Sequence, residues 1–293
     1  MCALCVSAIT PRPSCTRGNH LPRRGATRRY GWRMPRRRAD TLLAERGLAP
    51  SRTAAAATVR AGRVKLAKDG STVEKPSELV DEKAELIVAE GEQFVSRGGI
   101  KLQNALTELP VEVEGRRCLD VGASTGGFTD CLLQRGAEMV IAVDVGYGQL
   151  DWALRQDSRV LVMERLNARF LGDSYLPFRP ELITVDVSFI SLAKLIAPIV
   201  ATAADELDLL GLVKPQFELE KEKVGKGGVV RDAADRREAI RRVAEAARDE
   251  GLVIRGIASS GLPGPKGNRE TFVWAARSGE QVDLDAAIEE VEP

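Results

Sequence analysis

The stretch from Cys118 to Thr129 constrains the fold of this chain more than any other. A short apolar run gives way to small residues and glycines, and an apolar pattern restarts after Asp130. This order is typical of a buried strand, a tight turn and the start of a helix. Gly122 and Gly126 permit positive φ and close backbone approach, so the helix can present its free N–H groups to a ligand. The stretch therefore predicts a ligand site, with an ordinary empty turn as the alternative.

A second apolar run, 139–143, ends at Asp144, whose carboxylate is suited to accept hydrogen bonds from a ribose diol. The glycines do not have the G-x-G-x-x-G spacing of dinucleotide-binding proteins, and the acid at Asp120 is a further departure. Both departures argue against a nicotinamide-dependent dehydrogenase. The segment instead resembles the first motif of S-adenosylmethionine-dependent methyltransferases. That resemblance implies S-adenosylmethionine as the cofactor, bound by Asp120, Gly122, Ala123, Ser124, Gly126, Gly127, Phe128, Asp144, Asn167 and Asp186.

Five apolar runs are expected to be strands, at 117–120, 139–143, 159–163, 182–186 and 207–213. Helical patterns separate most of them, which predicts an α/β fold with a parallel, doubly wound, Rossmann-like sheet and ligands at the carboxyl ends of its strands. Asp186 and Lys214 end two of these strands. A lysine there is costly to desolvate unless it faces a cleft or a carboxylate, so a functional role and a structural ion pair with Asp186 both stay open. Glu270, at the start of a late strand, is expected at the same cleft.

Residues 34–90 have a different character, with two short helical patterns that stop at Gly47 and Gly62, and strand patterns at 63–66 and 86–88. We expect a small α+β domain with a basic face that contacts RNA phosphates, the alternative being a merely solvated basic surface. The pattern around Arg38-Ala39-Asp40, Ser51-Arg52 and Lys75-Pro76-Ser77 resembles the RNA-binding fold shared by a small-subunit ribosomal protein and many pseudouridine synthases. The predicted RNA-binding residues are Arg46, Arg52, Arg60, Arg63, Lys65 and Lys68.

Charge is unevenly distributed along the 293 residues. Residues 1–38 contain ten arginines and no acid, which leaves 33 basic against 42 acidic residues in the rest of the chain. Residues 1–33 lack apolar periodicity, so we expect a disordered leader, a transit-peptide-like segment, or a mis-assigned start with Met34 as the true first residue. The acidic end, 281–293, is expected to be a tail, and 91–96 a linker between the domains.

The cysteines do not form a disulfide framework, because three lie in the leader and two lie in apolar core patterns. A reducing, cytoplasmic location is therefore expected. The leader's Cys2, Cys5, Cys15 and His20 lack the spacing of a zinc knuckle, so no metal is predicted. The longest mostly apolar stretch, 190–204, is interrupted by Lys194 and Pro198 and is shorter than the roughly 20 residues that cross a bilayer, so no membrane contact is expected.

Four motifs, at 96–102, 120–129, 213–218 and 225–232, resemble those of the TlyA family. The resemblance covers Met34 to about Arg277. It implies an RNA-binding head joined to an FtsJ-like methyltransferase domain, 97–280, that modifies a ribose 2′-hydroxyl of ribosomal RNA, expected at a cytidine, with ribosomal RNA or ribosomal subunits as partners. It also implies a catalytic tetrad, Lys101, Asp186, Lys214 and Glu270. Members are often labelled haemolysins.

The chemistry of methyl transfer suits these residue types. The reaction is an in-line displacement that needs alignment and removal of a weakly acidic proton. A lysine acts as a base only when its pKa is depressed, which burial beside a second lysine would cause. We expect Lys214 to be the base or to orient the hydroxyl, Lys101 to be its electrostatic partner, and the two carboxylates to orient them. A non-catalytic ribosome-assembly factor and a pore-forming haemolysin are the alternatives, and the latter lacks a secretory signal and a spanning segment.

Overall fold

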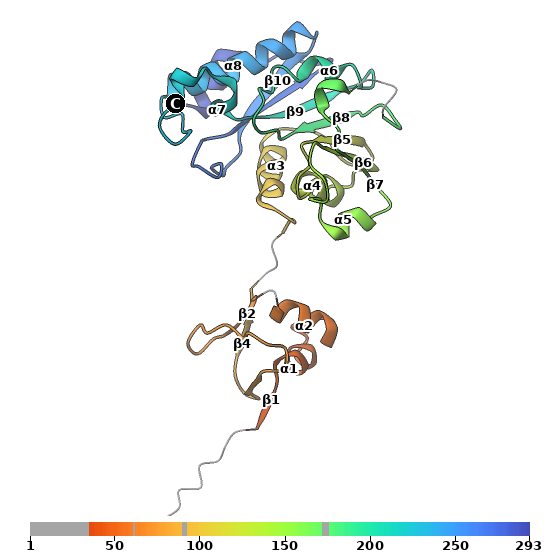
Figure 1. Ribbon diagram of the computed structural model, residues 1–293, viewed down its shortest axis with the longest axis vertical. Helices are drawn as coiled ribbons and strands as arrows, with labels where there is room; N and C mark the ends of the chain where they lie inside the picture. Colours follow the sequence, from red (N-terminus) through yellow and green to blue (C-terminus); the bar gives the residue numbers. More distant parts are fainter. Residues whose placement is uncertain (1–34, 61, 90–92, 172–175) are drawn as a thin grey trace, which may run out of the picture. The chain divides into compact units, whose positions relative to one another are not determined.

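The computed structural model describes residues 35–60, 62–89, 93–171 and 176–293 (Figure 1). The chain divides into two compact units between Ala89 and Glu90. The predictions made for residues 1–33 lie outside the described residues, as does part of the expected linker. Each unit is described by itself below.

The small unit contains two helices and two pairs of short antiparallel strands, β1 with β3 and β2 with β4. Its elements are β1 Arg36–Arg38, α1 Ala39–Glu45, α2 Arg52–Arg60, β2 Val64–Leu66, β3 Leu79–Asp81 and β4 Leu86–Val88. Ser51 caps α2, because its Oγ accepts a hydrogen bond from the N–H of Ala54 at 3.1 Å. The β1–β3 pair was not expected, because three consecutive arginines carry no alternation of apolar and polar residues.

The large unit is built around a seven-stranded sheet in the order β10-β11-β9-β8-β5-β6-β7. Its strands are β5 Arg117–Val121, β6 Met139–Asp144, β7 Val160–Glu164, β8 Leu182–Val185, β9 Asp208–Val213, β10 Val253–Ser259 and β11 Thr271–Ala276. The five strands β7, β6, β5, β8 and β9, which are neighbours in this order, are parallel, as predicted. At the other edge of the sheet the late strand β11, for which no direction was predicted, runs antiparallel to β9 and to β10. A loop rather than a crossover helix joins β10 to β11, which permits the reversal.

Helices cover both faces of the sheet (Figure 1). They are α3 Arg97–Glu108, α4 Gly127–Gln134, α5 Trp152–Gln156, α6 Ile196–Val200, α7 Pro215–Glu218, α8 Ala233–Asp249 and α9 Leu284–Val291, with 3-10 turns η1 Ala168–Phe170 and η3 Lys221–Lys223. Alternate residues of β5 enter different cores: Leu119 packs in the core that contains α8, and Cys118 packs in the core that contains α4. The sheet is therefore a buried middle layer, and its loops meet at the carboxyl ends of the parallel strands.

The acidic end of the chain belongs to the large unit rather than forming a free tail. Leu284 and Ile288 of α9 are buried in the same core as α8. The Glu292 carboxylate is 1% exposed and accepts a hydrogen bond from Arg236 Nε at 2.8 Å. In the described part of the chain, no helix combines the length and apolar character needed to cross a bilayer.

Candidate active site

The turn between β5 and α4 is built for close backbone contact. Gly122 has φ of +86°, and a Cβ there would lie 2.3 Å from the carbonyl oxygen of Asp186. A Cβ on Gly127, at the start of α4, would lie 2.2 Å from Ser96 Oγ and 2.7 Å from the backbone nitrogen of Gly99. Only glycine fits at these positions. The turn thereby brings β5 against the end of β8, and the start of α4 against the start of α3.

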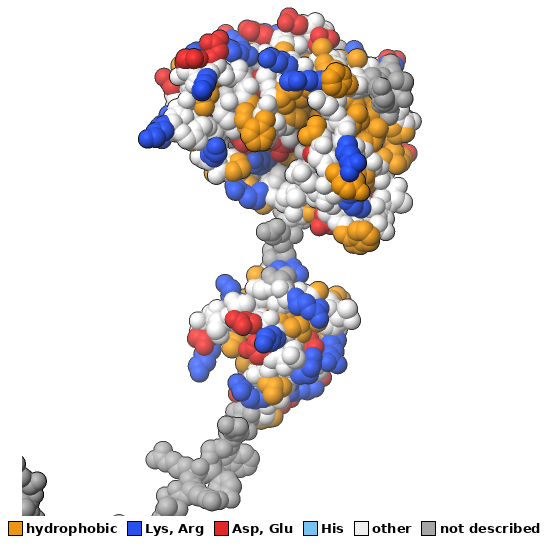
Figure 2. Space-filling view, viewed as in Figure 1, with side chains coloured by type: hydrophobic (Ala, Val, Ile, Leu, Met, Phe, Trp, Pro, Cys, Tyr) orange, Lys and Arg blue, Asp and Glu red, His pale blue; other side chains and the backbone are white. Residues whose placement is uncertain are grey.

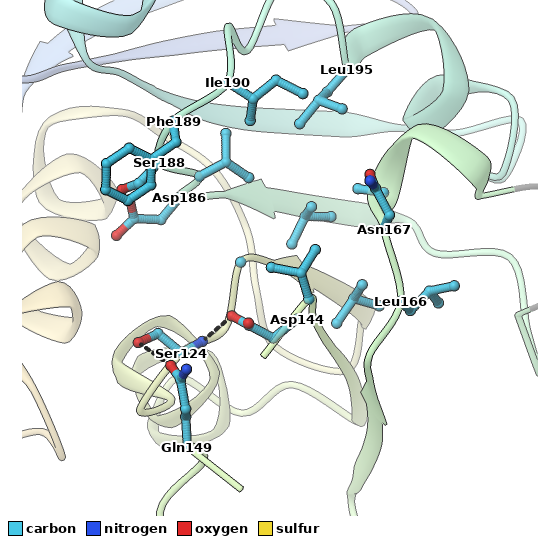
Figure 3. A pocket seen from close by; sticks show the side chains of 16 residues that line it. Ser124, Asp144, Gln149, Leu166, Asn167, Asp186, Ser188, Phe189, Ile190 and Leu195 are labelled. Atoms are coloured by element: carbon cyan, nitrogen blue, oxygen red, sulfur yellow. Dashed lines mark hydrogen bonds between the residues drawn. The ribbon is translucent and has the colours of Figure 1, made fainter. Parts of the chain in front are cut away.

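A cavity of about 330 Å³ opens at the carboxyl ends of β5, β6 and β8 (Figure 3). The Asp144 carboxylate faces it and is held by two backbone N–H groups, of Ser124 at 2.8 Å and of Gly146 at 2.6 Å. Asn167 lines another side, and its side chain accepts a hydrogen bond from the N–H of Arg169 at 3.1 Å. Apolar side chains complete the wall: Leu166, Ile190 and Leu195. An oriented carboxylate beside an apolar wall suits a nucleoside.

A smaller cavity of about 120 Å³ adjoins the first, because Gly122, Ser124 and Asp186 line both. It lies at the first residues of α3 and α4, and Ala123, Gly127 and Phe128 are also among its lining residues. Lys101 lines it too. Helix N-termini carry free N–H groups and partial positive charge, so this cavity suits a carboxylate.

The four residues of the expected tetrad form two ion pairs. The Lys101 ammonium donates to Glu270 Oε2 at 2.5 Å, and these side chains are only 9% and 1% exposed. The Lys214 ammonium contacts Asp186 Oδ1 and donates to Ser188 Oγ at 3.0 Å. The Lys214–Asp186 contact is ionic and lacks the angles of a hydrogen bond. Because Asp186 lines both cavities, one pair lies directly at the site and Lys101 lies on its smaller side.

Three residues expected to bind a cofactor have packing or hydrogen-bonding roles within the fold. Asp120 is fully buried and lines neither cavity; its carboxylate accepts from Thr129 Oγ1 at 2.7 Å and Thr184 Oγ1 at 3.4 Å. Burial raises the pKa of Asp120 to about 7. The Phe128 side chain is 3% exposed, and its ring lies 5.8 Å from that of Phe272, although the residue lines the smaller cavity.

Gly126, the third of these residues, lines neither cavity. Its φ is +98°, and a Cβ there would lie 2.3 Å from Leu154 Cδ1. It therefore serves the packing of the turn against α5.

Ser188 and Phe189 were missed by the sequence analysis, although both line the larger cavity. Phe189 has φ of +66° and is 93% exposed, with its ring 5.5 Å from the ring of Phe217. A non-glycine residue in this conformation is strained and is often found at functional sites. The sequence signal that could have indicated Phe189 is its place three positions after Asp186, the acid at the end of a predicted strand.

The basic residues of the small unit divide between exposed and structural positions. Arg60, Lys65 and Lys68 are exposed, and Arg63 is half-buried. Arg46 donates to the carbonyl oxygens of Glu82 and Ala84.

Arg52 reaches Asp40 at 3.3 Å and so also takes part in holding the small unit together. Arg38 hydrogen-bonds the same carboxylate and holds the pKa of Asp40 well below its usual range. Figure 2 shows Lys and Arg side chains over much of the visible face of the unit, with acidic side chains among them.

Comparison with known proteins identifies both units. Residues 94–277 match the model of the FtsJ-like methyltransferase family, and residues 37–86 match the S4 domain. A Mycobacterium tuberculosis protein named 16S/23S rRNA (cytidine-2'-O)-methyltransferase TlyA is 48% identical over 82% of this chain and 89% of its own length. The chain belongs to the TlyA family. The family resemblance stated from the motifs is thereby confirmed, and the dehydrogenase alternative is wrong.

Two further relatives of the TlyA-family chain carry the haemolysin name. Hemolysin A of Brachyspira hyodysenteriae is 38% identical over 80% of this chain and 97% of its own. A solved Streptococcus thermophilus structure, titled as a hemolysin, has a TM-score of 0.66 and 39% identity, and covers 88% of this chain and 94% of that one. The methyltransferase fold with an S4 domain is therefore shared by proteins with both kinds of name. Among the described residues, no three His, Cys, Asp or Glu side chains group as metal ligands would.

Proposed function

We propose that this protein transfers a methyl group from S-adenosylmethionine to the 2′-hydroxyl of a cytidine ribose in ribosomal RNA. The observation that carries the proposal is the pair of lysine–carboxylate contacts, Lys214 with Asp186 and Lys101 with Glu270, beside the two joined cavities. The relative from M. tuberculosis is named for this reaction. A non-catalytic assembly factor would not need these buried charges, which are costly to desolvate.

The lining residues fit S-adenosylmethionine. Asp144 offers lone pairs to a ribose diol, and the apolar wall with Asn167 suits an adenine ring. The methionine carboxylate would lie in the smaller cavity, toward the N–H groups at the start of α3 and α4. The proposed contacts are those lining residues that sequence and structure share: Gly122, Ala123, Ser124, Gly127, Phe128, Asp144, Asn167 and Asp186. When bound, this cofactor supplies a methyl group on a sulfonium, a good leaving group.

The residues of the chain align the ribose and move one proton. With the cofactor bound, the ribose oxygen would take up the methyl group that the cofactor supplies, and Lys214 would accept the hydroxyl proton on its side-chain nitrogen. Asp186 would stabilise the ammonium that forms on Lys214. Ser188 Oγ would orient the Lys214 side chain through the hydrogen bond that it accepts from Nζ. The contact with Glu270 holds the Lys101 side chain in place at the smaller cavity. Positioning supplies much of the acceleration, because the reacting atoms are held in line.

The small unit would bind the substrate RNA, and the large unit would carry out the transfer. An S4 domain with exposed Arg60 and Lys65 suits contacts with phosphates, which give affinity without fixing the sequence. Ribosomal RNA or a ribosomal subunit is the proposed partner, and the cytoplasm is the proposed location because the substrate is found there.

The test compares 2′-O-methylation of ribosomal RNA, mapped by mass, after incubation with the wild type, Lys214→Ala, Lys101→Ala and Lys221→Ala. Lys221 is an exposed lysine of η3 outside both cavities and is the matched control. We expect methylation at a cytidine that falls by about 100-fold or more in the first two variants, with calorimetric cofactor affinity within about tenfold. Near-normal turnover of Lys214→Ala would refute the role given to this residue. Absence of wild-type methylation on any ribosomal RNA would refute the function.

A further inference from the structure

The loop that follows β8, residues 186–192, carries five residues that line the larger cavity, and Asp186, Ser188 and Phe189 are among them (Figure 3). Its near end is fixed, because the N–H of Asp186 donates to the carbonyl oxygen of Val121 at 2.9 Å. Its middle is exposed and includes the left-handed residue Phe189. Such a conformation persists only where the surroundings hold it. Something must therefore fix the far end of the loop.

Glu218 lies at that far end. Its side chain comes from the last residue of α7, four positions after Lys214. One carboxylate oxygen accepts from the backbone N–H of Leu192 at 2.7 Å, and the other accepts from the hydroxyl of Ser191 at 2.7 Å. The residue is 7% exposed. Burial raises the pKa of Glu218, and the bonds from Ser191 and Leu192 oppose that rise.

The helix that carries Glu218 is itself anchored. Arg242 of α8 donates to the carbonyl oxygen of Glu218 at 3.0 Å. The ring of Phe217, one residue earlier, contacts the ring of Phe189. One short segment, 214–218, therefore supplies a charged partner for Asp186, a ring for Phe189 and an anchor for the end of the same loop.

We propose that Glu218 is a positioning residue, which fixes the loop 186–192 so that Asp186 and Ser188 keep the Lys214 side-chain nitrogen aligned with the ribose hydroxyl. The proposal rests on the methyl transfer proposed above. Glu218 touches neither cavity, so its effect passes through the loop. Its loss should lower turnover through misalignment rather than weaken cofactor binding, since small displacements of reacting groups are costly in rate.

The experiment uses the full chain with four variants. Glu218→Met keeps the size of the side chain and removes both acceptors. Glu218→Gln is the conservative variant, because its oxygen can accept from Leu192 and its amide can donate to the hydroxyl of Ser191. Ser191→Ala removes one bond only and gives a milder variant that folds even if Glu218→Met does not. Glu292→Gln is the control, a carboxylate equally buried and paired with Arg236, outside the site.

Two readouts are measured: kcat for ribosomal RNA with the calorimetric Kd for S-adenosylmethionine, and amide hydrogen exchange of peptides that span 187–192. We expect kcat of Glu218→Met to fall by about tenfold or more with the cofactor Kd within about threefold, and Glu218→Gln to recover most of the rate. Exchange in 187–192 should rise in Glu218→Met and, less, in Ser191→Ala, while Glu292→Gln leaves both kcat and exchange in this loop unchanged.

Unchanged exchange in Glu218→Met would overturn the proposal, as would faster exchange with normal kcat. If Glu218→Met does not fold, unchanged exchange or unchanged kcat in Ser191→Ala overturns it. A wild type without methyl transfer would count against the function itself, and the exchange data would still decide whether Glu218 anchors the loop.

Discussion

Asp120 belongs to the sequence motif that is expected to bind the cofactor, but its burial leads to a prediction about stability. The residue is fully buried between β5, β8 and α4, and its carboxylate accepts hydrogen bonds from the hydroxyls of Thr129 and Thr184. Burial raises its pKa from 3.8 to about 7. The substitution Asp120→Asn keeps the shape, keeps an oxygen for Thr129 and removes the titration. We expect this variant to be more stable than the wild type above neutral pH.

The sign follows from proton uptake in the two states. Below pH 4 the carboxyl is protonated both folded and unfolded, so it contributes no pH dependence. Between pH 4 and 7 the unfolded chain releases the proton while the folded chain keeps it, so stability falls as pH rises. Above the folded pKa of about 7 the loss is constant. At about 1.4 kcal/mol per pKa unit, the shift corresponds to at most about 4 kcal/mol.

The assay is urea unfolding of both proteins from pH 4 to pH 8.5, followed by tryptophan fluorescence. Trp274, 4% exposed in β11, reports on the core of the large unit. Taking the difference between the two proteins at each pH cancels the other carboxylates. We expect free energies of unfolding that agree near pH 4 and diverge by about 2 to 4 kcal/mol in favour of Asp120→Asn at pH 8.

A wild type that stays the more stable protein by 1 kcal/mol or more at pH 8 would refute this reasoning, since it would show an ionised Asp120 that its surroundings favour. The same variant should bind S-adenosylmethionine with an affinity within about threefold of the wild type, because Asp120 lines neither cavity. A large loss of affinity without a loss of stability would restore the cofactor role expected from the sequence.

The remaining predictions concern the cofactor turn and the RNA-binding unit. Asp144→Ala should weaken cofactor binding in calorimetry by about 10- to 100-fold, because charge-assisted hydrogen bonds contribute about 1.5 to 3 kcal/mol; an unchanged Kd contradicts it. Gly122→Ala should lower the free energy of unfolding by more than the about 1 to 2 kcal/mol that left-handed φ alone costs, because its Cβ meets a backbone oxygen. Gly251→Ala, with φ of +78° and no atom within 4 Å, is the matched control, and equal losses would contradict the clash. Lys65→Ala should reduce the slope of log K for RNA against log salt by about 1 without changing Tm, whereas Arg46→Ala should lower Tm as well because it binds two backbone carbonyls.

Local features of the fold could be predicted from the sequence, because their causes are local. The glycine turn at 122–127 and the five parallel strands follow from short-range patterns, and so does the Ser51 cap. The α9 helix was not foreseen, because its burial depends on Leu284 and Ile288 meeting α8, far away in the sequence. An acidic composition alone does not indicate a packed helix.

The burial of Asp120 was not predicted from the sequence, for a geometric reason. An acid near the end of an apolar strand indicates a ligand when its side chain faces the cleft. Asp120 lies two positions after Cys118 and therefore on the same face of the sheet, toward α4 and Thr129. The alternation of side chains along β5 therefore indicates which face of the sheet Asp120 occupies. Only the folded position of α4 shows that this face is covered by a helix. Ser188 and Glu218 were missed because their partners lie 26 residues away or more.

The antiparallel edge of the sheet, which was not expected, is what allows the tetrad to form. Thr271 pairs with Val213, so the first residue of β11 lies beside the last residue of β9. Glu270 directly precedes β11 and Lys214 directly follows β9. The two residues consequently lie beside the same ends of these neighbouring strands. Had β11 run parallel to β9, the six residues of β11 would place Glu270 about 20 Å away, at the opposite end of the strands. The antiparallel direction of β11 therefore places Glu270 next to Lys101, which lies 169 residues earlier in the chain. The Lys101–Glu270 ion pair can then form close to the Lys214–Asp186 pair.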